Sequence, residues 1–455
     1  MYPMIAQKIF VPLQERLKRK PTFRLLRELA ETERLSEGDL RALQLARLRE
    51  LLEYARREVP YYRRCFDKAK IQPAELKSLR DFASIPYLDK ETIRARGEEL
   101  RPEARRAGVQ RMSTGGSTGT PVAVYVDRER AAFTDAARMR AQSWFGIVPG
   151  AREIALWGSP IELGRQDRLR GMRDRLINSR FLAAFNMGER EMADYAATIR
   201  RYRPEKMYGY ASAFYLLAEY LRGRSWAPPA ELKVIFVTAE PLYDFQRDAV
   251  ERVFGCAVAV EYGARDAGLM ANQCPAGGLH IPAEGMLIEI DAPDATGLGE
   301  IVATNFFSRA MPIIRYRTGD MGRLIEGTCA CGRALPRLES VEGRRTDFLV
   351  TPSGRLLHAL AVIYPLRECA SIKRFQVVQE AIDRIIVRVV GNPSSKDIHE
   401  LSQKLQSTVG AGIKITIDCV AEIPSAASGK YRYVISPAAD EAIKNLGAKP
   451  MSAAV

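Results

Sequence analysis

Residues 113–126 read S-T-G-G-S-T-G-T-P-V-A-V-Y-V, and the rest of the chain is interpreted outward from them. The stretch opens with small hydroxyl residues and three glycines, turns at Pro121 and then alternates apolar residues. Glycine permits positive φ and lets backbone approach a ligand closely, while hydroxyl and N–H groups can follow phosphate oxygens. The stretch is therefore either a phosphate-binding loop or an ordinary Gly/Ser/Thr surface loop.

Two other phosphate-binding patterns do not fit this stretch. The pattern G-x-x-x-x-G-K-[ST] requires a lysine that is absent here, and no G-x-G-x-x-G opens a helix. Because the loop alone does not separate its two interpretations, the motifs downstream must decide.

Composition indicates a globular protein of two or three domains. The chain has 455 residues, of which 47% are hydrophobic and 27% are charged. Its net charge of +14 comes from basic residues spread through amphipathic segments, a pattern that argues against nucleic-acid binding. A nucleotide, an acyl-CoA or an anionic membrane surface would account for the charge equally well.

Targeting and redox signals favour the cytoplasm. The seven cysteines form no disulfide framework typical of a short secreted chain, which indicates a reducing compartment. The sequence contains no apolar run of about 18 residues, the length expected of a membrane span. Its N-terminus also lacks a signal-peptide cleavage pattern.

The first twenty residues predict a basic helix. Ile5, Ile9, Leu13 and Leu17 recur every four residues, with lysines and arginines between and after them. Such a helix either lies on a membrane surface or packs on its own domain, and Pro12 is expected to interrupt it. We assign residues 1–36 to an N-terminal helical extension.

Helical patterns alternate with short apolar runs over the following part of the chain, which predicts an α/β fold with ligands at the carboxyl ends of parallel strands. Helices are expected at 37–59, 128–142, 192–202 and 211–221, and buried strands at 154–157, 233–237 and 257–260. A strand-rich section spans 286–320. A final α+β section has strands at 375–378, 385–390 and 413–417 and a helix at 394–409.

Several short motifs stand in order along this framework, and each is weak by itself. They are Y-G-Y-A-S-A at 208–213, T-A-E-P-L at 238–242, E-Y-G-A-R-D at 261–266, Y-R-T-G-D at 316–320, C-G-R-A-L-P-R at 331–337, G-R-R-T-D at 343–347 and I-P-S-A-A-S-G-K at 423–430. Together, behind a Ser/Thr/Gly loop, they resemble the adenylate-forming superfamily of acyl-CoA synthetases and adenylation domains. Within it, the chain is most similar to the phenylacetate-CoA ligase branch and its capsule-biosynthesis relatives.

The resemblance covers residues 40–436 and implies a domain organisation. A large N-terminal adenylate-forming domain with parallel or mixed sheets and flanking helices would span 37–345. A small, mobile α+β C-terminal domain would span 346–440, with a hinge near Thr346 and Asp347 and a tail at 441–455.

The resemblance also implies roles in binding ATP. The loop would hold the β- and γ-phosphates; its members are Ser113, Thr114, Gly115, Gly116, Ser117, Thr118, Gly119 and Thr120. Ala239 and Glu240 would border the adenine, on which Tyr262 of the Tyr262-Gly263 pair would stack. Asp320 would accept both ribose hydroxyls, and Arg344 would assist at the ribose or the phosphates.

Catalysis by such an enzyme would rest on Lys430, Thr118 and Asp266. Lys430 resembles the mobile lysine that bridges the carboxylate and the α-phosphate, where charge grows in the transition state. Asp266 resembles the Mg²⁺-binding carboxylate. The acid would be lined by Trp157, Tyr208, Tyr210, Ala211 and Phe214, for which ordinary core packing is the alternative.

Three departures from the family pattern stand out. Thr120 replaces a lysine, Asp266 replaces a glutamate, and alanines replace the threonine before the final S-G-K. These changes keep open a catalytically degenerate, membrane-associated scaffold as an alternative to an enzyme.

Two Cys-containing segments predict a structural zinc site. Cys274 and His280 stand six residues apart, and Cys329 and Cys331 form C-A-C in a Gly-flanked turn. Three thiolates and an imidazole make a closed tetrahedral set, although reduced cysteines in turns are the alternative. The four remaining cysteines, Cys65, Cys256, Cys369 and Cys419, are expected in the core.

The predicted function is ATP-dependent activation of a carboxylic acid, aromatic or arylacetic by analogy, with transfer to CoA. Transfer to an amine or a carrier protein is the second enzymatic interpretation. ATP, Mg²⁺ and CoA are the expected cofactors, with zinc as a structural metal. We expect a cytoplasmic protein with peripheral membrane contact through its basic N-terminus, no nucleic-acid partner, and a homodimer.

Overall fold

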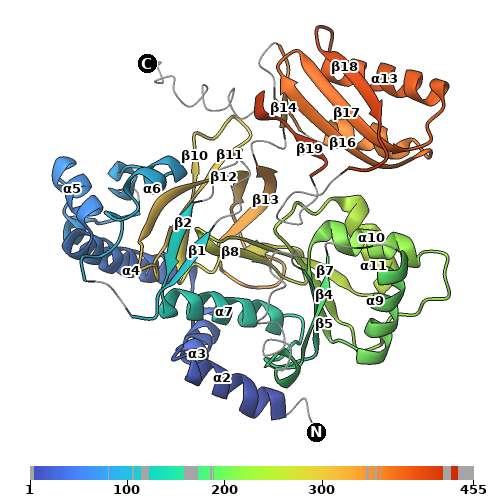
Figure 1. The fold of residues 1–455 in the computed structure, drawn as a ribbon. Helices are drawn as coiled ribbons and strands as arrows, with labels where there is room; N and C mark the ends of the chain where they lie inside the picture. Colours follow the sequence, from blue (N-terminus) through green and yellow to red (C-terminus); the bar gives the residue numbers. More distant parts are fainter. Residues whose placement is uncertain are drawn as a thin grey trace. The chain divides into compact units, whose positions relative to one another are not determined.

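The structure is a computed structural model that describes residues 5–79, 81–104, 107–113, 122–157, 173–184, 187, 189–344, 348–352, 356–358, 360–423 and 432–438. The chain divides into two compact units (Figure 1). Unit 1 contains Met1–Thr318 and Gly322–Val341, and unit 2 contains Gly319–Met321 and Glu342–Val455. The predicted hinge and the tail at 441–455 lie outside the described residues.

Helices open unit 1: η1 (Ala6–Phe10), α2 (Val11–Leu17), α3 (Thr22–Thr32), α4 (Glu37–Glu58), α5 (Pro60–Lys68) and α6 (Lys90–Arg96). The start of α4 is fixed by Ser36, whose side chain accepts a hydrogen bond from the Asp39 N–H. Its end is fixed by Pro60, which cannot continue the helix but fits the first position of α5. The helix predicted from residue 37 is therefore confirmed.

Pro12 does not interrupt the N-terminal helix, and that prediction is wrong. η1 is a π-helix that passes directly into α2, and Pro12 occupies the first turn of α2. A proline has no N–H to contribute, so it is accommodated where the hydrogen-bonding register changes from the π to the α pattern.

Unit 1 is built on an eleven-stranded sheet of order β10-β11-β12-β13-β9-β8-β7-β6-β5-β3-β4. Strands β7 (Ala257–Ala264), β6 (Val234–Thr238), β5 (Lys206–Gly209), β3 (Glu153–Trp157) and β4 (Ser179–Ala183) run parallel. Strand β7 pairs antiparallel with β8 (Gly268–Gln273), which continues to β9 (Leu279–His280) and β13 (Arg337–Arg344). The sheet is thus mixed, and the predicted α/β fold is confirmed.

The parallel strands are flanked by helices α9 (Glu189–Tyr202), α10 (Ala211–Leu221) and α11 (Asp244–Phe254), drawn in green in Figure 1. Helix α7 (Arg128–Ser143) follows the short hairpin of β1 (Gln110–Ser113) and β2 (Ala123–Val126). The hairpin encloses the Gly-rich loop in sequence, so α7 is the first helix after that loop.

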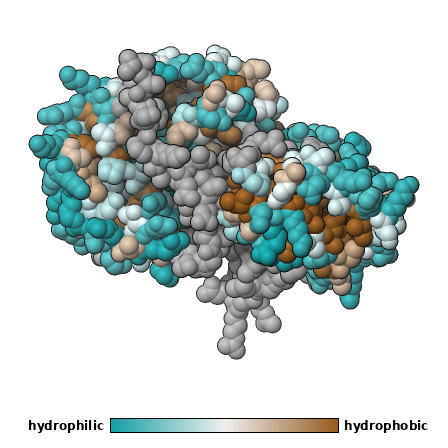
Figure 2. Space-filling view, turned by 90° about the horizontal axis from the view of Figure 1, so that it is seen from above, coloured by the Kyte–Doolittle hydropathy of each residue, from teal (hydrophilic) through white to brown (hydrophobic). Residues whose placement is uncertain are grey.

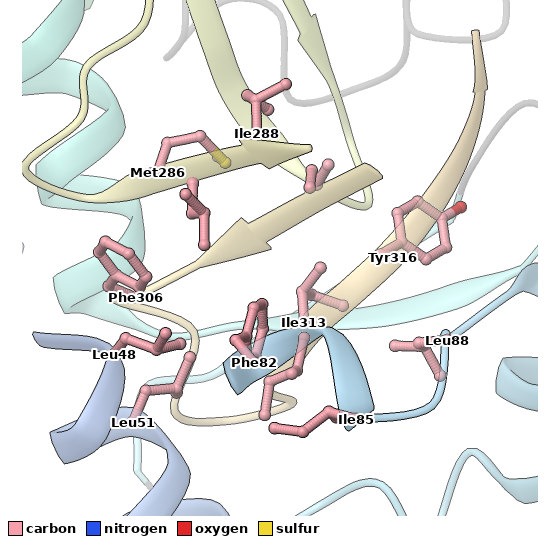
Figure 3. Packing of buried hydrophobic residues seen from close by; sticks show 14 of the residues in the cluster. Leu48, Leu51, Phe82, Ile85, Leu88, Met286, Ile288, Phe306, Ile313 and Tyr316 are labelled. Carbon is pink, nitrogen blue, oxygen red and sulfur yellow. The ribbon is translucent and has the colours of Figure 1, made fainter. Parts of the chain in front are cut away.

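The largest hydrophobic core lies beside the antiparallel strands β10 (Met286–Asp291), β11 (Gly299–Asn305) and β12 (Ile313–Ile325). Figure 3 shows Leu48 and Leu51 of α4, Phe82, and Tyr316 of β12 among its members. Each buried apolar side chain of this size contributes about 1.5–3 kcal/mol. The core therefore holds Tyr316 rigidly, and its backbone is also paired with Leu88.

The sequence indicated that the strand-rich section ends at the T-G-D motif, and that prediction is wrong. The motif lies inside β12, with Gly319 at φ 82°, and the strand continues to Ile325. Glycine adopts a positive φ without strain, so the strand continues through this position.

Unit 2 contains a four-stranded sheet of order β18-β17-β16-β19 (Lys414–Cys419, Arg384–Gly391, Ile372–Ala381 and Val434–Ile435). The hairpin of β14 (Phe348–Val350) and β15 (Leu356–His358) and the helices α12 (Leu360–Glu368) and α13 (Ser395–Val409) complete it. Buried Gln379 joins these parts, because its amide bonds the Val350 backbone and the Ser436 hydroxyl. The unit is α+β, as predicted.

Hydrophilic residues cover most of the described surface on the face drawn in Figure 2, and apolar residues form separate patches between them. Among the described residues, no helix is long and apolar enough to cross a membrane.

Candidate active site

The carboxyl ends of four parallel strands meet in one row. Leu156 of β3 pairs with Gly209 of β5, Gly209 with Val237 of β6, and Val237 with Val260 of β7. The next residues along these strands are Trp157, Tyr210, Thr238 and Glu261. Ligands of open α/β sheets bind at this edge, and the motifs predicted to bind nucleotide and acid follow these strands.

Gly209 is required by the close packing of this row. A Cβ atom at Gly209 would lie 2.1 Å from the Leu156 carbonyl oxygen. The Y-G-Y motif therefore lets β5 approach β3 closely and brings its two tyrosines beside the end of β3.

Three predicted substrate residues come together at this row. The rings of Trp157 and Tyr210 stack with centroids 4.3 Å apart, and Trp157 lies 5.7 Å from the ring of Tyr208. Ala211 at the start of α10 is buried, and so is Phe214 one turn later. Both belong to the core between the sheet and the helices.

Tyr208 is held by an ion pair that the sequence analysis did not single out, between buried Glu261 and partly buried Arg138. The guanidinium of Arg138 on α7 donates two hydrogen bonds to Glu261, of 2.7 and 2.8 Å, and the Tyr208 hydroxyl donates a third of 2.8 Å. Burial and the Glu261 charge both raise the pKa of Tyr208. Burial alone would lower the pKa of Arg138, but Glu261 raises it well above its usual value.

Asp266, the predicted Mg²⁺ ligand, is buried in the loop between β7 and β8. Its Oδ2 accepts a 2.5 Å hydrogen bond from the Tyr316 hydroxyl, and its Oδ1 accepts one of 3.0 Å from the Ala267 N–H. A carboxylate offers about four acceptor positions. Acceptor capacity therefore remains for a hydrated cation.

Arg130 on α7 holds the same loop from the other side. Its guanidinium donates to the backbone carbonyls of Arg265 (3.2 Å) and Asp266 (2.6 Å), and burial lowers its pKa to about 10. Arg130 and Arg138 thus connect α7 to both ends of the E-Y-G-A-R-D motif. They lie eight residues apart on α7, and no local sequence pattern singles them out for this role.

The predicted adenine residues lie after β6. Ala239 adopts φ 68°, a conformation that glycine takes more easily, and Glu240 accepts a 3.0 Å hydrogen bond from the Ser212 N–H near the start of α10. Glu240 thereby links the T-A-E motif to the helix that carries Ala211. Tyr262 is buried at the end of β7, and Gly263 packs against Gly268, whose carbonyl would lie 2.9 Å from a Cβ there.

The remaining predicted site residues are not all described. Residues 114–120 and Lys430 lie outside the described residues, and only the backbone is described for Ser113 and Arg344, which end β1 and β13. Asp320 is half-buried in β12 and groups with unit 2. Their predicted roles stay predictions.

The four predicted zinc ligands come together within unit 1. The ligand atoms of Cys274, His280, Cys329 and Cys331 all lie within 4.8 Å of one another. The Sγ atoms of Cys274 and Cys329 are 3.8 Å apart, and Nε2 of His280 lies 3.2 Å from Sγ of Cys331. With zinc–sulfur bonds of about 2.3 Å, a tetrahedron has a sulfur–sulfur edge of about 3.8 Å.

The protonation of His280 and Cys331 suits a cation, whereas burial raises the pKa of Cys274 to about 11. Nδ1 of His280 faces the Leu335 carbonyl at 3.3 Å, which can only accept, so Nε2 of the neutral ring presents its lone pair to the cysteines. Burial lowers the pKa of His280 to about 4. Burial opposes ionisation of Cys331, but hydrogen bonds from Arg333 leave the pKa of that thiol below its usual value.

Gly278 is a further requirement of the cluster, because a Cβ there would lie 2.6 Å from Sγ of Cys329. The prediction that the other cysteines are core residues is wrong for Cys419, which is exposed, whereas Cys65 and Cys256 are partly buried and pack against hydrophobic cores.

A family model described as the CapK C-terminal domain matches residues 349–437. The protein CapK of Staphylococcus aureus is 23% identical over 452 residues, which cover 95% of this chain and 97% of CapK. The phenylacetate-coenzyme A ligase of Thermus thermophilus is 28% identical over 446 residues, covering 89% of this chain and 98% of the ligase.

A solved structure of 2-hydroxyisobutyryl-CoA ligase in the postadenylation state shares the fold. It superposes with a TM-score of 0.71 at 21% identity, over 92% of this chain and 93% of that one. The same enzyme in the thioesterification state gives a TM-score of 0.59 over the same coverage. Over nearly its whole length this chain is thus similar to CapK and to a phenylacetate-coenzyme A ligase, and residues 349–437 match the CapK C-terminal domain.

Proposed function

We propose that the protein is an AMP-forming acid–CoA ligase. It activates a carboxylic acid with ATP, releases pyrophosphate and passes the acyl group from the acyl-adenylate to the thiol of CoA. The observation that carries this proposal is the match to a phenylacetate-coenzyme A ligase along 98% of that enzyme's length. The row of strand ends with Trp157, Tyr210 and Glu261 supports it, because it lies where this fold binds ligands.

The nucleotide lies at the carboxyl ends of β6 and β7. The hydroxyls and backbone of residues 113–120 hold the phosphates, Ala239 and Glu240 border the adenine, and Tyr262 stacks on it. Glu261 immediately precedes Tyr262 in the sequence. Its ion pair with Arg138 therefore fixes the end of the strand that carries Tyr262. Asp320 accepts the ribose hydroxyls, and Arg344 assists beside them.

Adenylate formation places negative charge on the α-phosphate. Lys430 neutralises that charge, and the Thr118 hydroxyl donates to the phosphates. Mg²⁺ would supply further neutralisation of the phosphate oxygens when bound. Asp266 fits such an ion, because Tyr316 and Ala267 orient its carboxylate without using all of its acceptor positions.

The acid is aromatic or arylacetic. Trp157 and Tyr210 form a stacked pair at the strand ends, and an aromatic ring could extend that stack edge-to-face or offset. Screening ATP–pyrophosphate exchange with a carboxylic-acid library tests both the activity and the acid class. Stimulation by arylacetic or aryl acids above aliphatic acids is expected, and no stimulation by any acid would refute the ligase.

Transfer to an amine or a carrier protein is the second candidate. Comparing AMP release with and without CoA separates the two acceptors. Turnover that needs CoA supports the ligase, whereas CoA-independent turnover on an amine supports the second candidate. A degenerate scaffold would fail to bind ATP in a calorimetric titration.

The thiol–imidazole cluster is proposed to hold a structural zinc ion, which would join the segments 274–280 and 329–331. Its four protein ligands leave no open position for substrate, as in closed structural sites. Elemental analysis of protein purified without chelator is expected to give one zinc per chain.

Two variants sharpen the zinc test. Cys329→Ser should lose the metal, whereas Cys419→Ser, at an exposed cysteine in unit 2, should retain it. Substoichiometric zinc in the unaltered protein would end the proposal.

We place the protein in the cytoplasm, where ATP and CoA are available. A homodimer and the lack of a nucleic-acid partner stay predictions.

A further inference from the structure

An exposed apolar row runs along the outer side of the N-terminal helix. Ile9, Leu13 and Leu17 are spaced by four residues and are 53%, 48% and 75% exposed. Residues four apart lie on one face of a helix. Isolated exposed leucines are ordinary, but three in one row expose a continuous apolar strip that folding of unit 1 does not use.

The inner side of this helix is already packed. Ala6, Val11 and Glu15 are buried, and the Thr22 hydroxyl donates a 2.5 Å hydrogen bond to Glu15 across the turn to α3. Lys20 forms a 2.5 Å ion pair with Asp135 of α7. The apolar row is therefore the outer face of an anchored element.

Two further exposed apolar residues belong to the same end of unit 1. The backbone at Gly150 lies against η1, since a Cβ there would be 2.9 Å from the Gln7 nitrogen, and Asn178 donates to the Gly150 carbonyl at 2.9 Å. Val148 and Leu176, each 45% exposed, lie two residues before Gly150 and Asn178. The nine large apolar side chains that are exposed among the described residues thus include five in this region.

This region lies at the amino ends of parallel strands. Gly150 lies three residues before β3 and Asn178 directly precedes β4, whereas the candidate active site lies at the carboxyl ends of these strands. A surface bound to this end would leave the substrate row of unit 1 at the opposite end of the strands.

Positive charge surrounds the apolar row. Residues 5–27 contain seven basic residues (Lys8, Arg16, Lys18, Arg19, Lys20, Arg24 and Arg27) and one acidic residue, a net charge of +6. A hollow of about 960 Å³ beside α2 is lined by six basic residues (Arg16, Arg19, Lys20, Arg24, Arg27 and Arg128) and three acidic ones (Glu15, Asp127 and Glu129). Within the described part of the chain, no carboxylate pairs with Lys8, Arg16, Arg19 or Arg27.

Arg19 is exposed at the tip of the turn between α2 and α3, with φ 54°. A glycine or asparagine would adopt this conformation more easily. Arg19 thus places an exposed cation at a backbone position where glycine or asparagine would be less strained.

We propose that the segment 5–27, with Val148 and Leu176 beside it, binds the surface of an anionic bilayer. Ile9, Leu13 and Leu17 enter the boundary between headgroups and acyl chains, and the surrounding cations pair with lipid phosphates, the hollow receiving headgroups. An apolar strip bordered by uncompensated cations matches the apolar interior and anionic surface of such a membrane. A second copy of this chain matches it less well, since two such surfaces would repel each other.

Co-sedimentation of the full chain with vesicles tests the proposal. Binding is expected to phosphatidylcholine vesicles with about one-third phosphatidylglycerol, and not to phosphatidylcholine alone, at about 0.1 M salt, where charges act over about 10 Å. The variant Arg16→Glu/Lys18→Glu/Arg19→Glu should bind at least about 100-fold more weakly. The variant Ile9→Ser/Leu13→Ser/Leu17→Ser should also lose binding.

Matched variants control for total charge and hydrophobicity. Lys373→Glu/Lys396→Glu/Lys414→Glu removes the same charge from exposed positions in unit 2, and Leu324→Ser/Ile325→Ser/Ile382→Ser removes other exposed apolar residues. Both should bind like the unaltered chain, and all variants should keep its circular dichroism and melting temperature.

Three results would overturn the proposal. The first is no binding to the anionic vesicles, and the second is an equal loss of binding in the control variants. The third is a chain that binds no vesicles but forms a dimer in solution, which is lost only in the Ile9/Leu13/Leu17 variant. None of these depends on the carboxylic acid or on ligase activity, so failure here is distinguishable from failure of the proposed function.

Discussion

At the scale of single residues, Glu261 shows how one buried carboxylate organises the substrate side of the site. It receives two hydrogen bonds from Arg138 and one from Tyr208, and its side chain is 4% exposed. Removing the cation would leave a buried charge, which costs far more than removing one neutral donor.

We therefore expect Arg138→Met to lower the free energy of unfolding by about 3–5 kcal/mol. Tyr208→Phe should lower it by only about 1.5–3 kcal/mol, the value of one hydrogen bond to a charged group. Urea denaturation of both variants and of the double variant measures this. Because the two partners share Glu261, their effects should not be additive, and strict additivity would contradict the described network.

The four residues of the thiol–imidazole cluster were predictable residue by residue, whereas the roles of Arg130 and Arg138 were not. Cysteines in Gly-rich turns beside a histidine have little reason to be there except a metal, so the sequence pointed to all four. An arginine on an amphipathic helix is usually solvated, and nothing local distinguishes the two that turn inward. Their carboxylate and carbonyl partners are more than a hundred residues away.

At the scale of elements, α7 connects the Gly-rich loop to the rest of unit 1. Besides Arg130 and Arg138 it carries Arg140, which forms an almost completely buried pair with Glu284, with contacts of 2.5 and 3.1 Å. Burial alone would raise the pKa of Glu284, but Arg140 and the Thr32 hydroxyl hold it below its usual value. The pair ties α7 and α3 to the segment before β10.

This pair predicts a pH-dependent stability. Because the folded pKa of Glu284 is lowered, its contribution is present above the unfolded value of about 4.3 and is lost as pH falls through the folded pKa. In Arg140→Met the unpaired, buried carboxyl should instead have a raised pKa. The variant should then be less stable by about 3–5 kcal/mol at neutral pH, and the difference should shrink toward acid pH.

Thermal unfolding between neutral pH and pH 3 of both proteins measures the effect. Arg41→Met, which removes an exposed pair with Glu37, should cost less than about 1 kcal/mol and show no such trend. A difference between Arg140→Met and the unaltered protein that stays constant with pH would contradict the role given to Glu284.

Elements were predicted well where periodicity decides them. Helix α4 shows a clear apolar face ended by a proline, and β6 is a continuous apolar run, so both followed from local pattern. The errors at Pro12 and Gly319 have one cause: both residues are usual breakers, and here neighbouring hydrogen bonds and strand pairing continue the element through them.

At the scale of the whole molecule, the two units carry different parts of the proposed chemistry. Tyr262 and Asp266 belong to unit 1, while Asp320 and the sequence that contains Lys430 belong to unit 2. In the proposed ligase, Lys430 would act in the first of the two half-reactions only, since the thioester step forms no pentavalent phosphorus.

Lys430→Ala should therefore slow adenylate formation by about 10²–10³-fold and leave thioester formation from supplied acyl-AMP unchanged. Asp320→Ala should chiefly raise the KM for ATP. Pyrophosphate release and CoA-thioester formation, followed separately, give both values. Equal loss of both half-reactions in Lys430→Ala would contradict the assignment, and Lys396→Ala at an exposed position provides the control.

The sequence by itself predicted the α/β class, the order of the motifs, the resemblance to adenylate-forming ligases and the four residues of the thiol–imidazole cluster. These follow from residue types at short spacing, which local chemistry and the order of motifs along the chain reveal. Only the tertiary structure decided which arginines turn inward, that Trp157 stacks on Tyr210, and that an apolar row stays on the outside of α2. Each of these depends on what distant segments bring against a side chain, and no local pattern carries that information.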